Sequence, residues 1–279
     1  MTVETPFSRS AILDRLARRR DAGEPILSAS AGIGLVARSA EAAGIDLLNI
    51  QVTGISRHLG VPTTTTLGNA TALTIEALPE IANVVEHTPI IGGLEATDGS
   101  RRDLRATIRR YRDLGFNGIS NFPTVGSMLT WADIRRSVGE GIDRDFQLIR
   151  LAREEDLFTL AHAYTADHAA ELAASGADVV VARCGATAGG MVGQPRENVS
   201  AEAACEYVQS VIDSVRRASA DTYVIAHGGP FATPEDAPSL FASTDADGIH
   251  GESAIERIPI EVHVAKQVAA FKNQRIRVA

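Results

Sequence analysis

Cysteine is scarce in this sequence: the 279 residues contain only two, Cys184 and Cys205. Two cysteines in so long a chain exclude the disulfide framework on which small secreted domains depend. No apolar run approaches the ~20 residues needed to span a bilayer, so no membrane partner is expected. The first residues also lack the basic stretch and apolar core of a secretory signal, and we therefore expect a cytoplasmic protein.

Positive charge is in deficit as well. Lys and Arg total 27 against 35 Asp and Glu, which gives a net charge of −8. Long-range attraction to nucleic acid or to an anionic membrane is therefore not expected, although a local basic pocket for a small anion stays open. The content of 44% hydrophobic and 22% charged residues is that of an ordinary globular protein.

Short apolar runs alternate with longer amphipathic segments along the chain, and the alternation occurs eight times. The runs are rich in Ile, Val and Leu, which is typical of parallel strands covered on both faces. They lie at residues 25–30, 47–52, 89–94, 118–122, 157–161, 178–182, 223–226 and 248–250. The chain length is close to the ~250 residues of one (β/α)₈ barrel. We predict an α/β fold, a single TIM-barrel domain over 1–279 with a helical lead-in over 1–24; an open doubly wound sheet is the main alternative.

Helical spacing fills the segments between the runs. It predicts helices over Arg101–Leu114 and Ala201–Ala218, the second with Ser200 as its N-cap, and helix starts at Thr233-Pro234 and Ile258-Pro259. Glycines that end a helix directly before a strand indicate tight loops on the lower face of a barrel; they are Gly44, Gly115 and Gly176. We expect the helix Ser10–Arg20 to plug that lower end.

The last helix carries an apolar stripe that includes Val262, Val264, Val268 and Phe271. This stripe either covers the eighth strand or packs against another copy of the chain, and we expect a homo-oligomer. Two loops after strands are long, Thr53–Gly68 with its run Thr63–Thr66, and Cys184–Val199 with four glycines. Long loops on the upper face of a barrel are usually lids or ligand loops.

Polar residues that follow the strands are the candidates for a site, because the carboxyl ends of barrel strands converge on one mouth. These ends carry Ser28, Ser30, Asn49, Gln51, Glu95, Asp98, Asn121, His162, Tyr164, Arg183, Cys184, His227, His250, Glu252 and Ser253. Any one histidine alone is more often structural. Three at separate strand ends are candidates for acid–base catalysis, with proton transfer by His227 or His250 and with His162 beside them. We expect Arg183 to pair a carboxylate or to stabilise an oxyanion.

Glycines at the last two strand ends indicate an anion site. Gly228, Gly229 and Gly251 permit a close backbone approach, and barrels often bind phosphate at the loops after strands seven and eight. The alternative is two tight turns without a ligand. Ser28, Asn121 and Ser253 are the further residues that we expect to bind substrate, a small anionic metabolite.

A divalent metal, Mg²⁺, is the expected cofactor, and Glu95 is its candidate ligand, because Mg²⁺ binds through one or two carboxylates plus water and substrate oxygens. Asp98 is more simply explained as a helix cap. A zinc site built from the three histidines lacks the HExxH spacing. Cys184 is either a nucleophile beside Arg183 or, more commonly, a packed thiol. No Walker pattern follows the glycines, so nucleotide binding is not supported.

Several stretches carry a family resemblance over almost the whole chain. They are Ala31–Gly34, Ala43–Leu47, Thr88-Pro89, Gly115–Gly126, Ala174–Val181, His227–Pro230, His250-Gly251 and Glu256–Pro259. On these the sequence resembles the phosphoenolpyruvate hydrolase-like TIM-barrel proteins, which also form the C-terminal barrel of plant inhibitors of viral RNA replication. The resemblance implies a barrel distantly similar to phosphoenolpyruvate mutase and isocitrate lyase, enzymes that use Mg²⁺ to hold 2-oxo acids and stabilise enolates. The N-terminal domain of the plant proteins is not in this sequence, so their inhibitor role is not expected.

The mouth departs from the family pattern in four places. Gln51–Gly54 replaces a Tyr-Asn-Ser-Gly-type stretch, Arg183 replaces a histidine, His162 replaces an aromatic residue, and the loop after His250 is shorter. Polar groups are thus replaced rather than deleted, which suggests a divergent member. We expect a hydrolase or lyase that acts on a small 2-oxo or 3-oxo acid or an enol phosphate through an enolate-like intermediate, with C–C cleavage favoured. The alternatives are a phosphoenolpyruvate- or phosphonopyruvate-type hydrolase and a non-catalytic barrel that binds a metabolite or a protein.

Overall fold

The computed structural model describes residues 7–65, 67–196 and 200–277. The start of the lead-in (1–6), Thr66 of the first long loop and 197–199 of the second lie outside the described residues. Eight parallel strands form a closed barrel in chain order, and β1 pairs with β8. The strands are β1 Ile26–Ser30, β2 Leu47–Ile50, β3 Ile90–Gly93, β4 Gly118–Ser120, β5 Phe158–Ala163, β6 Val179–Arg183, β7 Tyr223–His227 and β8 Gly248–Gly251. The predicted TIM barrel is confirmed, and the open sheet is wrong.

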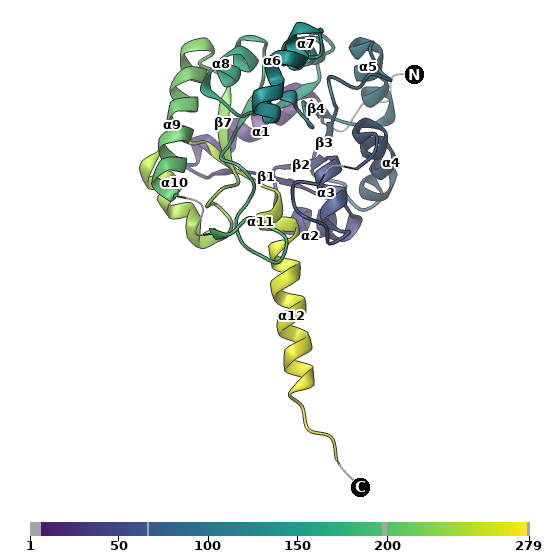
Figure 1. Cartoon of the computed structure of the whole chain (residues 1–279), viewed down its shortest axis with the longest axis vertical. Coiled ribbons are helices and arrows are strands. Elements are labelled where there is room, and N and C mark those ends of the chain that lie inside the picture. Colours follow the sequence, from purple (N-terminus) through teal and green to yellow (C-terminus); the bar gives the residue numbers. More distant parts are fainter. Residues whose placement is uncertain (1–6, 66, 197–199, 278–279) are drawn as a thin grey trace.

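Helices surround the barrel (Figure 1). They are α1 Arg9–Asp21, α2 Gly34–Ala42, α3 Val52–Arg57, α4 Ala70–Ala82, α5 Leu104–Leu114, α6 Ala132–Ser137, α7 Asp143–Glu154, α8 Ala166–Ala174, α9 Ala201–Ala218, α10 Ala237–Ser243, α11 Ser253–Glu256 and α12 Ile258–Lys272. Two 3₁₀ turns, η1 Val125–Trp131 and η3 Pro234–Asp236, precede α6 and α10. None of the helices in the described part of the chain is long and apolar enough to cross a membrane.

The helix ends follow from local chemistry. Ser200 accepts a hydrogen bond from the Ala203 amide and begins α9 as predicted. The helix predicted from Arg101 begins three residues later, because the Asp103 side chain accepts from the Ala106 amide and caps α5 there. Gly115 ends α5 with φ of 107°, and Gly44 and Gly176 are left-handed as well, as expected for the lower loops.

The lower half of the barrel is apolar. Ile12 and Leu16 of α1 are fully buried against the inward side chains of the strands, among them Leu47, Phe158 and Val181. The lead-in helix therefore closes this end, as expected. The interior above it is polar and leads into the mouth that is described below.

The last helix, α12, leaves the barrel and projects away from it (Figure 1). Val264 and Val268 are each 57% exposed and Phe271 is 76% exposed. The alternative that this stripe covers the eighth strand is therefore wrong: α12 carries its apolar side chains out into solvent.

Candidate active site at the mouth of the barrel

The upper ends of neighbouring strands place four of the predicted residues together. Arg183 and His227 are register partners, each the last residue of its strand, β6 and β7. His162 on β5 and His250 on β8 lie beside them, with the His250 ring centroid 5.3 Å from that of His162 and 5.5 Å from that of His227. All four side chains are at least nine-tenths buried. The convergence that the sequence predicted for these residues is present.

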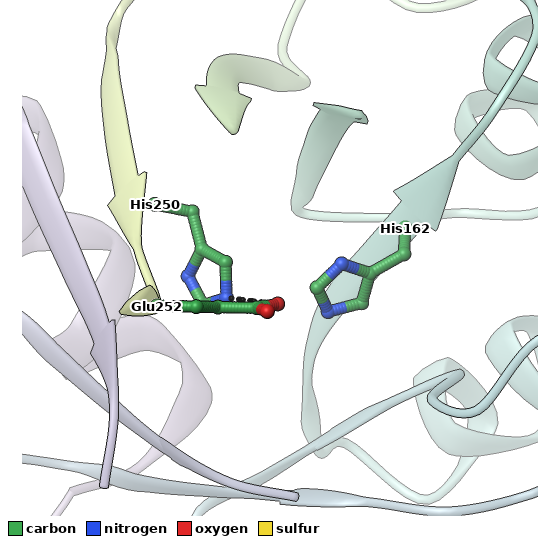
Figure 2. Close-up of side chains that lie close together, drawn as sticks. All are labelled: His162, His250 and Glu252. Carbon is green, nitrogen blue, oxygen red and sulfur yellow. Dashed lines mark ion pairs between the residues drawn. The ribbon is translucent and has the colours of Figure 1, made fainter. Parts of the chain in front are cut away.

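A carboxylate, Glu252, lies at the centre of this group. It follows β8 directly and is 3% exposed. The Nη1 of Arg183 donates to its Oε1 at 2.7 Å, and the Nε2 atoms of His250 and His227 lie 3.4 and 3.6 Å from its oxygens. Figure 2 shows this carboxylate between the rings of His162 and His250. Glu252 thus ties together the ends of three strands.

A second arginine approaches from the loop after β2. Arg57, the last residue of α3, donates from Nη1 to Glu252 Oε2 at 3.2 Å and from Nε to Glu256 Oε1 at 2.6 Å. Its Nη2 donates to the Ser30 hydroxyl. Two guanidinium groups are therefore paired with two carboxylates, so the buried network is balanced in charge.

The protonation states follow from burial and from these charges. Burial lowers the pKa of His227 to about 3, and the Arg183 charge acts in the same direction. Burial and Arg183 likewise hold the pKa of His162 well below its usual range. Burial alone would raise the pKa of Glu252, but Arg183 chiefly, with His227 and Arg57, keeps it well below its ordinary value. At neutral pH the site therefore holds neutral histidines around an ionised carboxylate.

Hydrogen bonds fix the histidine tautomers. The Nδ1 of His227 lies 2.8 Å from the His250 carbonyl oxygen, which can only accept, so Nδ1 carries the proton and Nε2 has the free lone pair. The Nδ1 of His162 lies 3.0 Å from Arg183 Nη1, which can only donate, so the proton is on Nε2. Of the two, only His227 presents a basic nitrogen.

A cavity of about 330 Å³ opens at this group. Its polar wall includes Arg183, His227 and Glu252, and the other lining residues are Thr53, Thr63, Thr64, Phe122, Pro123, Thr124, Ser127, Tyr164, Gly185, Ala186 and Thr187. Both long loops contribute residues. This size is at the lower end for ligand pockets, which suits a small metabolite.

The glycines after β7 are required by the chain itself. Gly228 and Gly229 have φ of 76° and 55°, and a Cβ on Gly228 would collide with the carbonyl oxygen of Gly185. A Cβ on Gly251 would collide with Ile255. These contacts explain the glycines without a ligand, so their role in anion binding stays a prediction.

The remaining predicted residues lie behind or beside the cavity. Ser28 bonds the Nδ1 of His250, Ser253 bonds the Thr63 hydroxyl, and Asn121 bonds Asp145 and the His162 backbone. Glu95 is half-buried near Asp98 and is not among the residues that line the cavity. The proposed roles of these four residues in substrate or metal binding stay predictions.

Cys184 is a packed thiol. Burial is the main cause that raises its pKa to about 12, and the nearby Arg183 charge only partly opposes the rise. A thiol with so high a pKa is not ionised near neutral pH, and the thiolate is the nucleophilic form. The structure therefore favours the packed alternative.

One His/Glu group among the described residues, formed by His162, His250 and Glu252, has donor atoms within 4.8 Å of one another and could by distance hold a metal ion. The chemistry of the group fits Mg²⁺ poorly, because Mg²⁺ prefers oxygen ligands and Glu252 is already bonded by two guanidinium groups. At an effective dielectric of ~20, unit charges ~4 Å apart interact by ~4 kcal/mol. A divalent ion beside one guanidinium would face roughly twice that repulsion.

Sequence reasoning missed Arg57 and noted Glu252 at a strand end without assigning it a role. Arg57 lies inside the long loop after β2, and the only signal for it was that upper loops reach the mouth. Asp145, from α7, was missed as well: it is fully buried, and burial raises its pKa to about 7. The sequence pattern does not distinguish a buried acid on a helix from an exposed one.

The fold and the mouth together define the class of protein: a closed (β/α)₈ barrel with a buried polar network at the carboxyl ends of its strands. More narrowly, the model of the family described as phosphoenolpyruvate hydrolase-like matches residues 11–274, and the chain belongs to this family.

A curated relative is ToMV resistance protein Tm-1(GCR237) of Solanum lycopersicum, 33% identical over 277 residues. The match covers 97% of this chain and 36% of that protein, so the chain spans about a third of its relative. A solved structure of phosphonopyruvate hydrolase in complex with oxalate and Mg++ has a TM-score of 0.60 at 15% identity, covering 93% of this chain and 87% of that one. Oxaloacetate acetylhydrolase with its product oxalate has a TM-score of 0.59 at 17% identity, covering 99% and 91%. At these identities the two structures show a shared fold.

Proposed function

We propose that this protein is a hydrolase or lyase that cleaves a C–C bond in a small 2-oxo or 3-oxo acid through an enolate-like intermediate. The proposal rests on one observation: Arg183 and His227, register partners at the ends of β6 and β7, both line one small cavity. The solved neighbours include a phosphonopyruvate hydrolase and an oxaloacetate acetylhydrolase, both described with oxalate. Oxalate consists of two directly joined carboxylates, so it resembles the carboxylate and the adjacent oxo carbon of a 2-oxo acid. We extend this class of ligand to the chain.

Arg183 and His227 have different roles, which follow from the charge of the first and the tautomer of the second. The Arg183 guanidinium holds a substrate carboxylate or the oxyanion of the enolate. The Nε2 lone pair of His227 removes a proton from the attacking water or from a substrate hydroxyl, and the imidazolium that forms is stabilised by Glu252, 3.6 Å away. Where water attacks, its oxygen bonds to the oxo carbon, the C–C bond breaks, and its electron pair passes to the enolate. The enolate then takes the proton from the His227 imidazolium as the acid product leaves.

Mg²⁺ was the expected cofactor, with Glu95 as its ligand. Since Glu95 is not in the cavity wall and Glu252 is bonded by two arginines, no step of this proposal is routed through a metal. A hydrolysis of the phosphonopyruvate type in the same cavity is the nearest alternative reaction. A non-catalytic binding barrel is the other candidate, favoured by the Tm-1 relative, which is described as a resistance protein rather than an enzyme.

The test is turnover on a panel of 2-oxo and 3-oxo acids and enol phosphates, with release of the acid product as the readout. We expect His227→Gln to lower kcat/KM by about 10²–10⁴, the usual contribution of a general acid–base group. His87→Gln is the matched control, because the His87 side chain is 82% exposed. Unchanged turnover in His227→Gln would remove its assigned role, and absence of turnover on the whole panel would favour the binding barrel.

A further inference from the structure

The guanidinium of Arg183 has one edge engaged and one edge free. Its Nη1 and Nη2 atoms face Glu252, at 2.7 Å from Oε1 and 3.5 Å from Oε2, and Nη1 also faces His162. The remaining edge consists of Nε and the second N–H of Nη2. Nε is buried and has no hydrogen-bond partner among the described residues. A buried N–H donor without a partner is costly, which points to a ligand that satisfies it.

Aromatic side chains fix the plane of this guanidinium. Its central carbon lies 4.9 Å from the ring centroid of Phe122 and 5.5 Å from that of Tyr164. Both rings, like Arg183 itself, belong to the cavity wall. With its plane held by the rings and its end held by Glu252, Arg183 has little freedom to reorient, so the free edge is preorganised.

The charges and hydrogen bonds around this arginine disfavour a cation. Glu252 accepts hydrogen bonds from both Arg183 and Arg57, so its oxygens are already engaged by two cations. His162 has its Nδ1 lone pair directed at Arg183 and its proton on Nε2. His162, one member of the group that could hold an ion by distance, therefore has no free lone pair to offer to an ion.

We propose that the free Nε/Nη2 edge of Arg183 binds the carboxylate of a 2-oxo acid or of oxalate directly and in bidentate fashion, with no divalent cation between ligand and protein. The planar fork of a guanidinium matches a carboxylate in this way. Arg183 presents its positive charge to the ligand on this edge, while Glu252 holds its other edge in place. This inference rests on the proposed function only for the class of ligand.

Oxalate binding by the full chain, measured by calorimetry in EDTA and again with excess Mg²⁺, tests the proposal on the wild-type protein. We expect one oxalate per chain with the same affinity in both buffers. Arg183→Lys should weaken binding by about tenfold or more, because an ammonium cannot reproduce the fork. His87→Gln should leave the affinity unchanged.

A second measurement looks for the cation itself. Mn²⁺, a spectroscopic substitute for Mg²⁺, is titrated into the EDTA-treated protein and its bound fraction is followed by electron paramagnetic resonance. We expect no stoichiometric ion. One bound ion per chain that is lost in Glu252→Gln, oxalate binding that needs Mg²⁺, or no oxalate binding in either buffer would each overturn the proposal. Turnover on the acid panel tests the proposed function separately, since an enzyme that proves to need Mg²⁺ would contradict this inference and leave the reaction class intact.

Discussion

At the scale of single residues, the structure of the mouth depends on one carboxylate that accepts hydrogen bonds from two buried arginines. Glu252 is fully enclosed and bonded to both Arg57 and Arg183. Removing one member of a buried charge network leaves the others unpaired in a medium that solvates them poorly. Glu252 is therefore as important for folding as for chemistry.

We predict that Glu252→Gln lowers the free energy of unfolding by roughly 3–5 kcal/mol, the usual cost of removing one partner from a buried ion pair. Urea denaturation followed by circular dichroism measures this change. Asp245→Asn is the control, because Asp245 pairs with Arg216 on the open surface and its loss should change stability little. Equal effects of the two substitutions would show that the buried network does not stabilise the barrel.

Asp145 gives a prediction about pH. Burial raises its pKa to about 7, against an ordinary value of about 4 in the unfolded chain. The folded state thus binds the proton more tightly, so its contribution to stability is full below about pH 4 and is lost as the pH rises through about 7. We predict that Asp145→Asn makes Tm less dependent on pH between about 4 and 7.

Scanning calorimetry across this range measures the effect. Asp143→Asn, which changes a half-exposed acid on the same helix, should keep the wild-type slope. An Asp145→Asn protein whose Tm changes between about pH 4 and pH 7 as steeply as that of the wild type would contradict the assigned pKa direction.

The sequence was sufficient to predict Arg183, His162, His227 and His250 at the mouth, because the ends of parallel strands converge in any closed barrel. It was not sufficient for Arg57. That arginine reaches the mouth through the path of a loop, which no periodic pattern specifies. The histidine tautomers were equally out of reach, since each depends on which atom lies opposite the ring.

At the scale of secondary structure elements, helix ends were predictable where a cap residue specifies them. Ser200 and Gly115 act locally, so their effect can be read from the sequence. The course of α12 was not predictable, because an apolar stripe looks the same whether it covers a strand of its own barrel or another molecule. The structure shows that the stripe does not cover β8.

We predict that α12 packs against a second copy of the chain and that the protein is a homo-oligomer. Ile260, Val264, Val268 and Phe271 follow each other at steps of four and three, so they share one side of the helix. Val264→Glu combined with Val268→Glu should shift the mass toward the monomer in light scattering after size exclusion. Isolated apolar residues on a surface are ordinary, but a continuous exposed stripe marks an interaction site.

The control for this experiment is Lys266→Glu combined with Ala269→Glu, which places the two new carboxylates on the opposite side of α12. It should keep the wild-type mass. A wild-type protein that is monomeric at all concentrations, with α12 still helical, would refute the prediction.

At the scale of the whole molecule, the barrel has an apolar interior at one end and a polar interior at the other. The lower interior is apolar and closed by α1, whereas the upper interior is a polar network that ends in a small cavity. Barrel closure was predicted because eight similar units recur, and it brings residues from positions 30 to 256 into one network. The identity of the substrate is not encoded at this scale, since the same fold supports many reactions.

The most direct test of the central claim, that this mouth binds a small oxo acid, is a crystal structure of the protein with oxalate. We predict oxalate in the cavity between Arg183 and His227, with its carboxylate on the free edge of the arginine. Oxalate bound elsewhere on the molecule, with this cavity filled by water alone, would contradict the account.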